Sequence, residues 1–270
     1  MKSKHQQAYA LVTGASCGLG KSFAIELAKQ GENLILVSRP NEGLGSLCNL
    51  LKNKYQVKTK YFEANLANLE ELLELTGRVN KKYNIKILIN NAGIGGVCNF
   101  ESTSKSFIDQ LINVNIRAVT LLTHQLLPKM RKNGKCYILN VASMAAFSPI
   151  GYKSIYPASK SFIYHFSLGL AEELKDENVV VSVVNPGPMR TNSSVTARIN
   201  VHGFFTKAGV ISTDIMAKLA LKKMFKGKRR IIIGRLNILA WMLLSLLPIQ
   251  IKLPMLTQAM KKELLISPAH

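Results

Sequence analysis

The sequence predicts an α/β fold: a doubly wound parallel sheet with helices on both faces and a ligand cleft at the carboxyl ends of its strands. Two observations lead to this fold class. Short apolar runs alternate along the chain with longer segments whose apolar residues recur at helical spacing. The first of these runs passes through a glycine-rich turn directly into a helical pattern. The length of 270 residues suits a single domain over residues 1–235, followed by a C-terminal extension over residues 236–270.

The N-terminal segment predicts a strand, a tight turn and a helix. Residues 9–12 are apolar, and the helical pattern that follows ends at Gly31, a residue type common at helix C-termini. In the turn between them, glycines allow the backbone to approach a pyrophosphate, whose charge is favoured by the helix N-terminus. This Rossmann-type turn predicts cofactor contacts from Gly14, Ser16, Gly18, Leu19 and Gly20. A glycine turn without a ligand is the alternative.

The residue after the second predicted strand indicates the kind of cofactor. Residues 33–38 form an apolar run, and Arg39 follows it. A carboxylate at this place would pair with the ribose 2′-hydroxyl of NAD, whereas an arginine suits a 2′-phosphate. We therefore expect NADP(H), with a solvated surface arginine as the alternative.

The middle of the chain continues the alternation of strand and helix. Short apolar runs predict strands at residues 60–64 and 85–89, with a helix at 70–82 between them. From 104 to 131 the apolar residues recur at helical spacing, and we expect a break only near Pro128, since proline disrupts helix interiors. This order of elements supports a parallel sheet.

The last part of the domain adds three strands and a helix to the pattern. Residues 136–141 form a short apolar run typical of a buried strand, and residues 179–184 are rich in valine. A helix at 212–225 begins with Ser, Thr and Asp, and a final strand is expected at 229–234. These elements complete a seven-stranded pattern.

The segment 192–211 shows no clear periodicity and contains two adjacent aromatic residues, Phe204 and Phe205. Loops of this length in compact domains are usually functional, so we expect a lid over an apolar substrate. The alternative is that the two aromatic side chains pack in the core.

Tyr156 and Lys160 could share one catalytic task. Pro157 suits the first turn of a helix, and a helix beginning there puts the two side chains on one face. A nearby ammonium favours the phenolate and lowers the pKa of the phenol, which makes Tyr156 a candidate proton donor to a carbonyl oxygen. Ser143 closely follows the predicted strand at 136–141 and would lie near its carboxyl end. For YxxxK alone, an ordinary surface pair is the alternative.

Four motifs in this order carry a family resemblance. The patterns TGxxxGxG from residue 13, NNAG from residue 90, Ser143 and YxxxK from residue 156 all occur. Over roughly residues 6–235 the chain resembles the classical short-chain dehydrogenases/reductases. The resemblance implies that Ser143 orients a substrate carbonyl, that Lys160 also contacts the nicotinamide ribose, and that Asn115 holds a water that relays protons. A purely structural hydrogen-bonding role is the alternative for Asn115.

The same resemblance implies further cofactor contacts. Asn65 stands where the family usually has an aspartate that touches adenine, which leaves this contact less defined. The remaining contacts are expected from Asn91, Ala92, Gly93, Tyr156, Lys160, Pro186, Gly187 and Thr191. No metal is expected.

The chain is most similar to ketone and 3-oxoacyl reductases with a hydrophobic C-terminal tail. This implies an NADPH-dependent oxidoreductase that reduces a ketone, or oxidises a secondary alcohol, on an apolar substrate of lipid or 3-oxoacyl type. The alternatives are a hydroxysteroid dehydrogenase and a non-catalytic NADP-binding protein at a membrane. The intact Ser-Tyr-Lys set argues against the last. A homodimer or tetramer is compatible with the sequence.

The chain is strongly basic, with a formal net charge of +21. After Glu177 there are fourteen Lys/Arg and only two acidic residues, which favours anionic partners. No nucleic-acid-binding module is recognisable, so we expect none of that class. The four cysteines lack CxxC or metal-ligand spacing, and the N-terminus lacks a signal-peptide pattern. We expect a cytoplasmic protein with reduced cysteines.

The C-terminal extension begins with sixteen uncharged residues, 236–251, directly behind eight Lys/Arg in 218–235. This run is short for a bilayer crossing, and it contains Pro248 and the single tryptophan, Trp241. Such a segment suits the interface of an anionic membrane, here as a peripheral contact on the cytoplasmic face. Packing on the domain or on a second subunit is the equal alternative.

Overall fold

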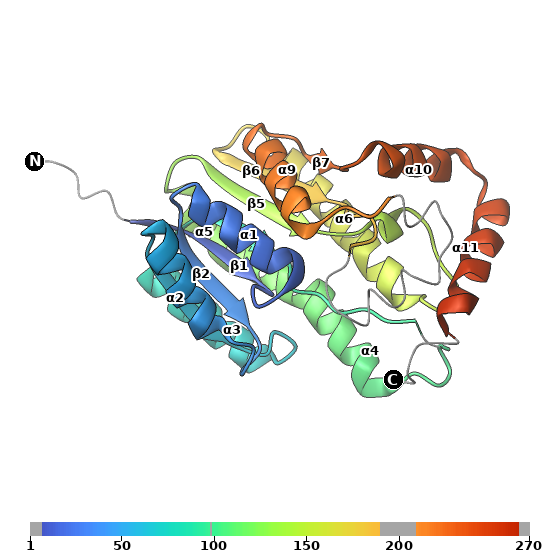
Figure 1. Cartoon of the computed structure of the whole chain (residues 1–270), viewed down its shortest axis with the longest axis horizontal. Helices are drawn as coiled ribbons and strands as arrows, with labels where there is room; N and C mark the ends of the chain where they lie inside the picture. Colours follow the sequence, from blue (N-terminus) through green and yellow to red (C-terminus); the bar gives the residue numbers. More distant parts are fainter. Residues whose placement is uncertain (1–6, 98, 190–208, 265–270) are drawn as a thin grey trace, which may run out of the picture.

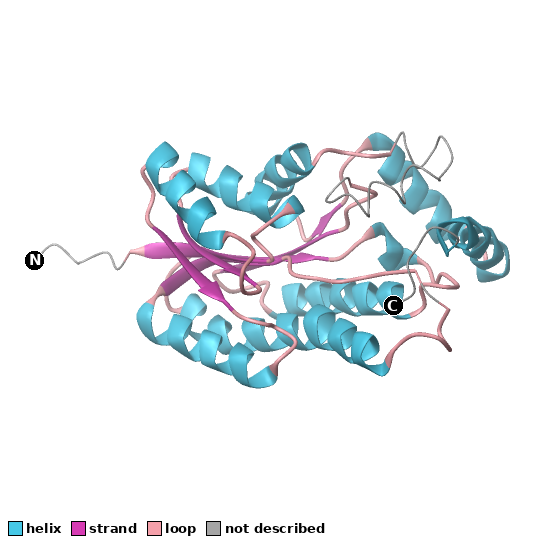
Figure 2. Cartoon of the chain, turned by 60° about the horizontal axis from the view of Figure 1, so that its bottom comes forward, coloured by secondary structure: helices cyan, strands magenta, loops and turns pink. Residues whose placement is uncertain are grey.

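The computed structural model describes residues 7–97, 99–189 and 209–264. They form a parallel sheet of seven strands in the order β3-β2-β1-β4-β5-β6-β7, with helices on both faces (Figure 1, Figure 2). The strands are β1 (Ala8–Thr13), β2 (Asn33–Ser38), β3 (Thr59–Glu63), β4 (Asn84–Asn90), β5 (Cys136–Val141), β6 (Val179–Val184) and β7 (Arg230–Ile231). The predicted fold class is confirmed.

The reversal of strand order beside β1 positions the ligand cleft. The chain runs from β1 outward to β3 and then returns to β4 on the other side of β1. Val12 of β1 therefore pairs with Leu36 of β2 and with Ile89 of β4. Where the connections diverge at the carboxyl ends of β1 and β4, an open α/β sheet has its ligand crevice.

Two layers of helices bury the two faces of the sheet. The principal helices are α1 (Gly18–Lys29), α2 (Leu44–Tyr55), α3 (Leu69–Lys82), α4 (Lys105–Ile112), α5 (Val119–Arg131), α6 (Ile155–Glu173) and α9 (Thr213–Phe225). Phe23 of α1 and Leu221 of α9 share one core with the strands, whereas Leu72 of α3 and Leu122 of α5 belong to the core on the opposite face. Both cores consist mainly of apolar side chains, which accounts for the apolar strand runs.

Three elements differ from the sequence-based expectations. Helix α2 was not predicted, although its buried residues Leu44, Leu47, Cys48 and Leu51 recur at helical spacing. The long helical pattern is not broken at Pro128, which lies inside α5; it is interrupted at the π-helical turn η1 (Asn113–Ala118). The last strand is only two residues long and pairs only with β6, so it is an edge strand.

The C-terminal extension forms two helices, α10 (Arg235–Leu246) and α11 (Ile249–Leu264), which we call the C-terminal hairpin. Among the described residues, no helix combines the length and apolarity that crossing a membrane requires. Figure 1 shows the two helices at the end of the molecule beyond α6, away from β2 and β3. The hairpin therefore sits on the side where the strands of the central sheet end.

One side of the hairpin packs on the domain. The buried Asn237 donates hydrogen bonds from Nδ2 to the carbonyl oxygens of Ile233 at 2.9 Å and Gly209 at 3.2 Å. The ring centroid of Trp241 lies 6.1 Å from that of Phe147. On α11, Thr257 Oγ1 accepts a hydrogen bond of 3.0 Å from the Gly151 backbone N–H. Packing on the domain thus accounts for this side of the hairpin.

The opposite side of α10 is an exposed apolar stripe. Leu236, Leu239, Leu243 and Leu246 recur at a spacing of three or four residues, so they share one face. Leu239 is 51 % exposed, Leu243 is 52 % exposed and Leu246 is 81 % exposed. We call Leu239, Met242, Leu243, Leu246, Ile249 and Ile251 the outer apolar surface; all six side chains are at least 42 % exposed.

We expect Gly151→Ala to loosen the hairpin and to reduce stability by about 1–3 kcal/mol, as overpacking typically does. A methyl group on Gly151 would lie 2.6 Å from Thr257 Cγ2, too close for any Cβ contact. Urea unfolding measures the change. Gly169→Ala on α6 is the control, because no atom lies within 4 Å of its added methyl group. Equal stability of Gly151→Ala and wild type would show that this contact does not hold the hairpin.

Candidate active site

The helix α6 carries both Tyr156 and Lys160, as the sequence predicts. The Lys160 ammonium lies 5.8 Å from the centroid of the Tyr156 ring. Its Nζ donates a hydrogen bond of 3.0 Å to the carbonyl oxygen of Val141, the last residue of β5. Burial lowers the pKa of Lys160 to about 8, because removal from water disfavours the charged form. The helix thus places a buried cation under a half-buried phenol.

Asn115 links the end of β4 to α6 through the π-helical turn η1. It is fully buried, and its side-chain oxygen accepts a hydrogen bond of 2.9 Å from the Ile94 N–H. Its Nδ2 donates to the Ile94 carbonyl oxygen at 2.9 Å and to Ser159 Oγ at 3.0 Å. A methyl group on Gly93 would lie 3.1 Å from Lys160 Nζ and 3.3 Å from Asn115 Oδ1. Gly93, Asn115 and Lys160 therefore meet at one point.

Ser143 follows the same strand, β5, two residues after Val141. It precedes the short 3₁₀ helix η2 (Met144–Phe147), and its Oγ accepts a hydrogen bond of 3.1 Å from the Ala145 N–H. A hydroxyl can accept and donate at the same time, so this bond is compatible with donation to a substrate carbonyl. The predicted Ser143 thus lies in the turn after β5, and Tyr156 and Lys160 lie on α6.

The glycine turn packs directly against the NNAG segment. Gly14 and Gly18 have positive φ angles of 62° and 54°, which favour glycine. A methyl group on Gly20 would lie 2.0 Å from the Gly14 carbonyl oxygen and 2.5 Å from Asn91 Nδ2. Asn91 Nδ2 in turn donates to the carbonyl oxygens of Thr13 at 2.9 Å and Gly14 at 3.2 Å. These glycines let the turn pack closely on the NNAG segment, and a glycine turn of this kind directly before a helix N-terminus suits a pyrophosphate.

Glu42 is a neighbour of Arg39 that sequence reasoning missed. Arg39 is 73 % exposed and forms an ion pair of 2.9 Å with Glu42. Ser16 Oγ donates to the same carboxylate at 2.7 Å. Burial raises the pKa of Glu42, but the hydrogen bonds from Ser16 and Arg39 outweigh it and lower the pKa below the ordinary value. The three-residue spacing from Arg39 was the signal available in the sequence.

Most of the remaining predicted cofactor residues lie along the same edge of the sheet, and the others lie outside the residues that the structure describes. Asn65 follows β3, where its Oδ1 accepts a hydrogen bond of 3.1 Å from the Ala67 N–H. The Pro186 carbonyl oxygen accepts one of 2.9 Å from the Met144 N–H. Leu19 is buried, and Ala92 N–H donates to Thr13 Oγ1 at 3.0 Å. Thr191 and the lid residues Phe204 and Phe205 lie outside the described residues.

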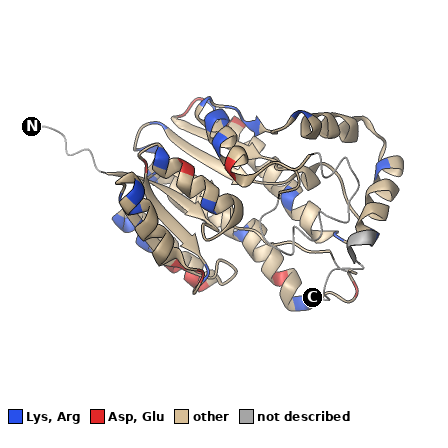
Figure 3. Ribbon diagram, viewed as in Figure 1, with Lys and Arg blue, Asp and Glu red and all other residues tan. Residues whose placement is uncertain are grey.

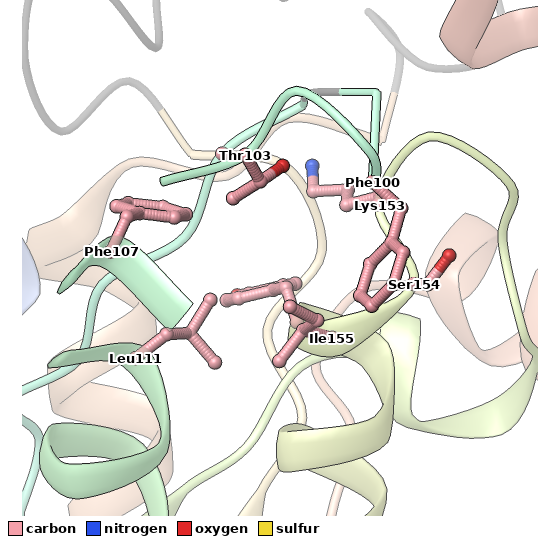
Figure 4. Close-up of a pocket in the computed structure, with 9 residues that line it drawn as sticks. Phe100, Thr103, Phe107, Leu111, Lys153, Ser154 and Ile155 are labelled. Atoms are coloured by element: carbon pink, nitrogen blue, oxygen red, sulfur yellow. The ribbon is translucent and has the colours of Figure 1, made fainter. Parts of the chain in front are cut away.

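A pocket adjoins the ring of Tyr156 (Figure 4). Its walls come from the loop after β4, from α4 and from the start of α6, and include Phe100, Thr103, Phe107, Leu111, Lys153 and Ile155. The loop after β4 passes close over the phenol, since a methyl group on Gly95 would lie 2.4 Å from Tyr156 Cδ2. This mostly apolar pocket was not predicted from the sequence, because its residues carry no shared motif.

The family model for short chain dehydrogenases matches residues 8–202. The chain is 35 % identical over 195 residues to a very-long-chain 3-oxoacyl-CoA reductase of Anas platyrhynchos, covering 69 % of this chain and 61 % of that protein. It is 30 % identical over 223 residues to hydroxysteroid dehydrogenase-like protein 1 of Gallus gallus, covering 81 % and 67 %. The alignments with the 3-oxoacyl-CoA reductases of duck and of Danio rerio span 61 % and 63 % of those proteins.

Solved structures show the same fold. A short-chain dehydrogenase from Sphingobium yanoikuyae in complex with NADPH is 29 % identical, with a TM-score of 0.74, covering 83 % of this chain and 86 % of that one. The bulky-bulky ketone specific alcohol dehydrogenase from Comamonas testosteroni is 27 % identical, with a TM-score of 0.73, covering 91 % and 96 %. Together with the match of the family model over residues 8–202, these findings show that the chain belongs to the short-chain dehydrogenase family.

Proposed function

We propose that this protein is an NADPH-dependent reductase of ketones on apolar substrates of lipid or 3-oxoacyl type. The observation that best supports this proposal is the position of Lys160. Its ammonium is buried against Val141 and lies 5.8 Å from the centroid of the Tyr156 ring, and Tyr156 lines a mostly apolar pocket. An ammonium so close to a phenol prepares it for proton transfer, and the residues that line the pocket beside the phenol are mostly apolar. The relatives named for 3-oxoacyl-CoA and bulky ketones support the same substrate class.

The cofactor of the proposed reaction is NADP(H), which supplies the hydride when bound. The glycine turn with Gly14, Gly18 and Gly20 suits its pyrophosphate, because it leads directly into the N-terminus of α1. Arg39 suits the 2′-phosphate at the end of β2. Among the similar solved structures, the Sphingobium yanoikuyae enzyme is in complex with NADPH.

Each member of the catalytic set has one task in the proposed reduction. Ser143 donates a hydrogen bond that orients the substrate carbonyl, and Tyr156 gives its proton to the carbonyl oxygen. Lys160 favours release of that proton through its positive charge. Asn115 holds the relay water that returns a proton toward Lys160, at the point where Gly93, Asn115 and Lys160 meet.

Consumption of NADPH, followed by absorbance, tests the proposal. We expect turnover with a long-chain 3-oxoacyl thioester and with a bulky ketone, and weaker turnover with NADH. A steroid ketone belongs in the same panel, because of the 30 % identity to hydroxysteroid dehydrogenase-like protein 1. Binding of NADPH without turnover of any ketone or secondary alcohol would instead favour a non-catalytic NADP-binding protein.

We also propose that the outer apolar surface of the C-terminal hairpin rests on an anionic membrane at the cytoplasmic face. Soluble monomers rarely expose so continuous an apolar area without a partner. Figure 3 shows α10 without charge along most of its length, and basic residues near its ends. Arg230, Arg235 and Lys252 flank the hairpin's apolar segment, an arrangement that suits anionic head groups around an inserted apolar face.

We expect the protein to sediment with anionic liposomes at low salt and to be released as salt rises, since surface attraction is screened within about 8–10 Å at 0.1–0.15 M salt. Leu239→Asp with Leu243→Asp should abolish binding, because both side chains lie on the outer apolar surface. Leu50→Asp is the control, since Leu50 is an equally exposed leucine on α2.

Two results would count against membrane binding. One is full binding by the double variant. The other is a wild-type protein that ignores liposomes but dissociates from a dimer when the two aspartates are introduced, which would assign the outer apolar surface to a second copy of the chain.

A further inference from the structure

A second lysine, Lys153, lies beside the catalytic phenol and has no place in the proposed mechanism. Its Nζ is 5.4 Å from the centroid of the Tyr156 ring. In Figure 4 it lies near Thr103 and Phe100, across the pocket from Leu111. Lys153 is half-buried and belongs to the wall of the pocket.

The two lysines are placed for different tasks. Lys160 is 4 % exposed, and its ammonium is turned to the backbone of β5, where it bonds the Val141 carbonyl oxygen. Lys153 precedes α6 and lines the same pocket as Tyr156. Lys153 therefore belongs to the wall of the pocket, with its ammonium over the Tyr156 ring, whereas the charge of Lys160 faces the interior of the protein.

The rest of the pocket sets the character of the ligand. Phe107, Leu111 and Ile155 provide apolar walls, and Thr103 adds a hydroxyl. Binding pockets of this kind hold an apolar group by contact area and fix its orientation through a few polar side chains. A cation on such a wall selects ligands that carry an electron-rich oxygen close to the apolar chain.

We infer that Lys153 is a specificity-determining residue that binds the carboxyl-derived oxygen of a 3-oxo substrate, while the ketone two carbons away lies at Tyr156. The inference rests on the proposed ketone reduction and names the polar end of its substrate. Because Lys153 lies so near the phenol, it reaches an oxygen adjacent to the reacting ketone but not one at the far end of a long chain. The formal net charge of +21 also favours substrates with an anionic group.

The experiment compares three substrates with the same alkyl chain: a 3-oxo acid, its thioester and the ketone that lacks the carboxyl group. We expect Lys153→Met, which keeps an unbranched apolar side chain and removes the charge, to lower kcat/KM for the 3-oxo acid relative to the ketone by about tenfold or more, mainly through KM. The thioester, with a neutral carbonyl, should show a smaller loss. Lys153→Arg should restore most of the preference. Lys81→Met, an exposed lysine on α3, is the control.

Equal effects of Lys153→Met on all three substrates would overturn the inference, as would no effect on any. A shift of the pH profile for the simple ketone would also overturn it, because Lys153 would then act on Tyr156 rather than on the substrate. Failure of the wild-type protein to reduce any of the three would instead refute the proposed function itself.

Discussion

Tyr156→Phe is expected to lower kcat for ketone reduction by a factor of at least about 10², the low end for general acid-base catalysis. The substitution removes only the hydroxyl that gives a proton to the carbonyl oxygen. The ring remains, so the contact with the loop at Gly95 and the proximity to Lys160 are retained. We therefore expect the loss in kcat rather than in folding or in cofactor affinity.

Steady-state kinetics and NADPH fluorescence titration measure the two effects separately. Tyr164→Phe is the matched control, because Tyr164 lies on the same helix and packs its ring on Phe147 at a centroid distance of 5.0 Å. If the Tyr156→Phe variant turned over ketones nearly as fast as the wild type, the proposed mechanism would be refuted. A comparable loss in the Tyr164 variant would attribute the effect to the helix rather than to the phenol.

The sequence predicted the central strands well, because helices cover both faces of the sheet and make these strands apolar throughout. Strands β2, β5 and β6 occur at the expected residues, since each is buried on both faces by helices and so reads as a short apolar run. Helix α2 and the π-helical turn η1 were missed, and they differ in what the sequence shows of them. The sequence does carry a signal for α2, because Leu44, Leu47, Cys48 and Leu51 recur at helical spacing and are buried. A π-helical turn, by contrast, differs from an α-helix in backbone register rather than in residue type.

The site residues that could be predicted follow strand ends or, for Tyr156 and Lys160, share one helix. Gly14, Asn91 and Ser143 each follow a strand of a parallel sheet, so they share one edge. The pocket beside Tyr156 combines side chains of three segments, and no local pattern relates Phe100 to Ile155. Likewise, which side of the C-terminal hairpin packs on the domain could not be predicted, because it depends on tertiary contacts such as that of Thr257 with Gly151.

The second large effect is expected at the adenosine end of the cofactor site, on the affinity for NADPH. Arg39→Ala should weaken NADPH binding by about tenfold, while NADH, which lacks the 2′-phosphate, should lose little. A charge-assisted hydrogen bond is worth roughly 1.5–3 kcal/mol, and we take the lower end because Arg39 is 73 % exposed and its charge is screened by water. Fluorescence titration of both reduced cofactors measures the difference.

The ion pair with Glu42 supplies an opposite variant. The Glu42 carboxylate lies 2.9 Å from the Arg39 guanidinium and would repel a phosphate brought to the same group. Glu42→Gln should therefore tighten NADPH relative to NADH, in the direction opposite to Arg39→Ala. Arg78→Ala is the matched control, because Arg78 is also exposed and paired with a glutamate, Glu74, on α3.

Opposite signs for the two variants would follow only if the 2′-phosphate meets both charges. If Arg39→Ala weakened both cofactors equally, Arg39 would not contact the 2′-phosphate, and the preference for NADPH would have to come from another group. If Glu42→Gln left the ratio unchanged while Arg39→Ala lowered it, Arg39 would turn away from Glu42 when it binds the phosphate, because the carboxylate would then lie too far away to oppose it.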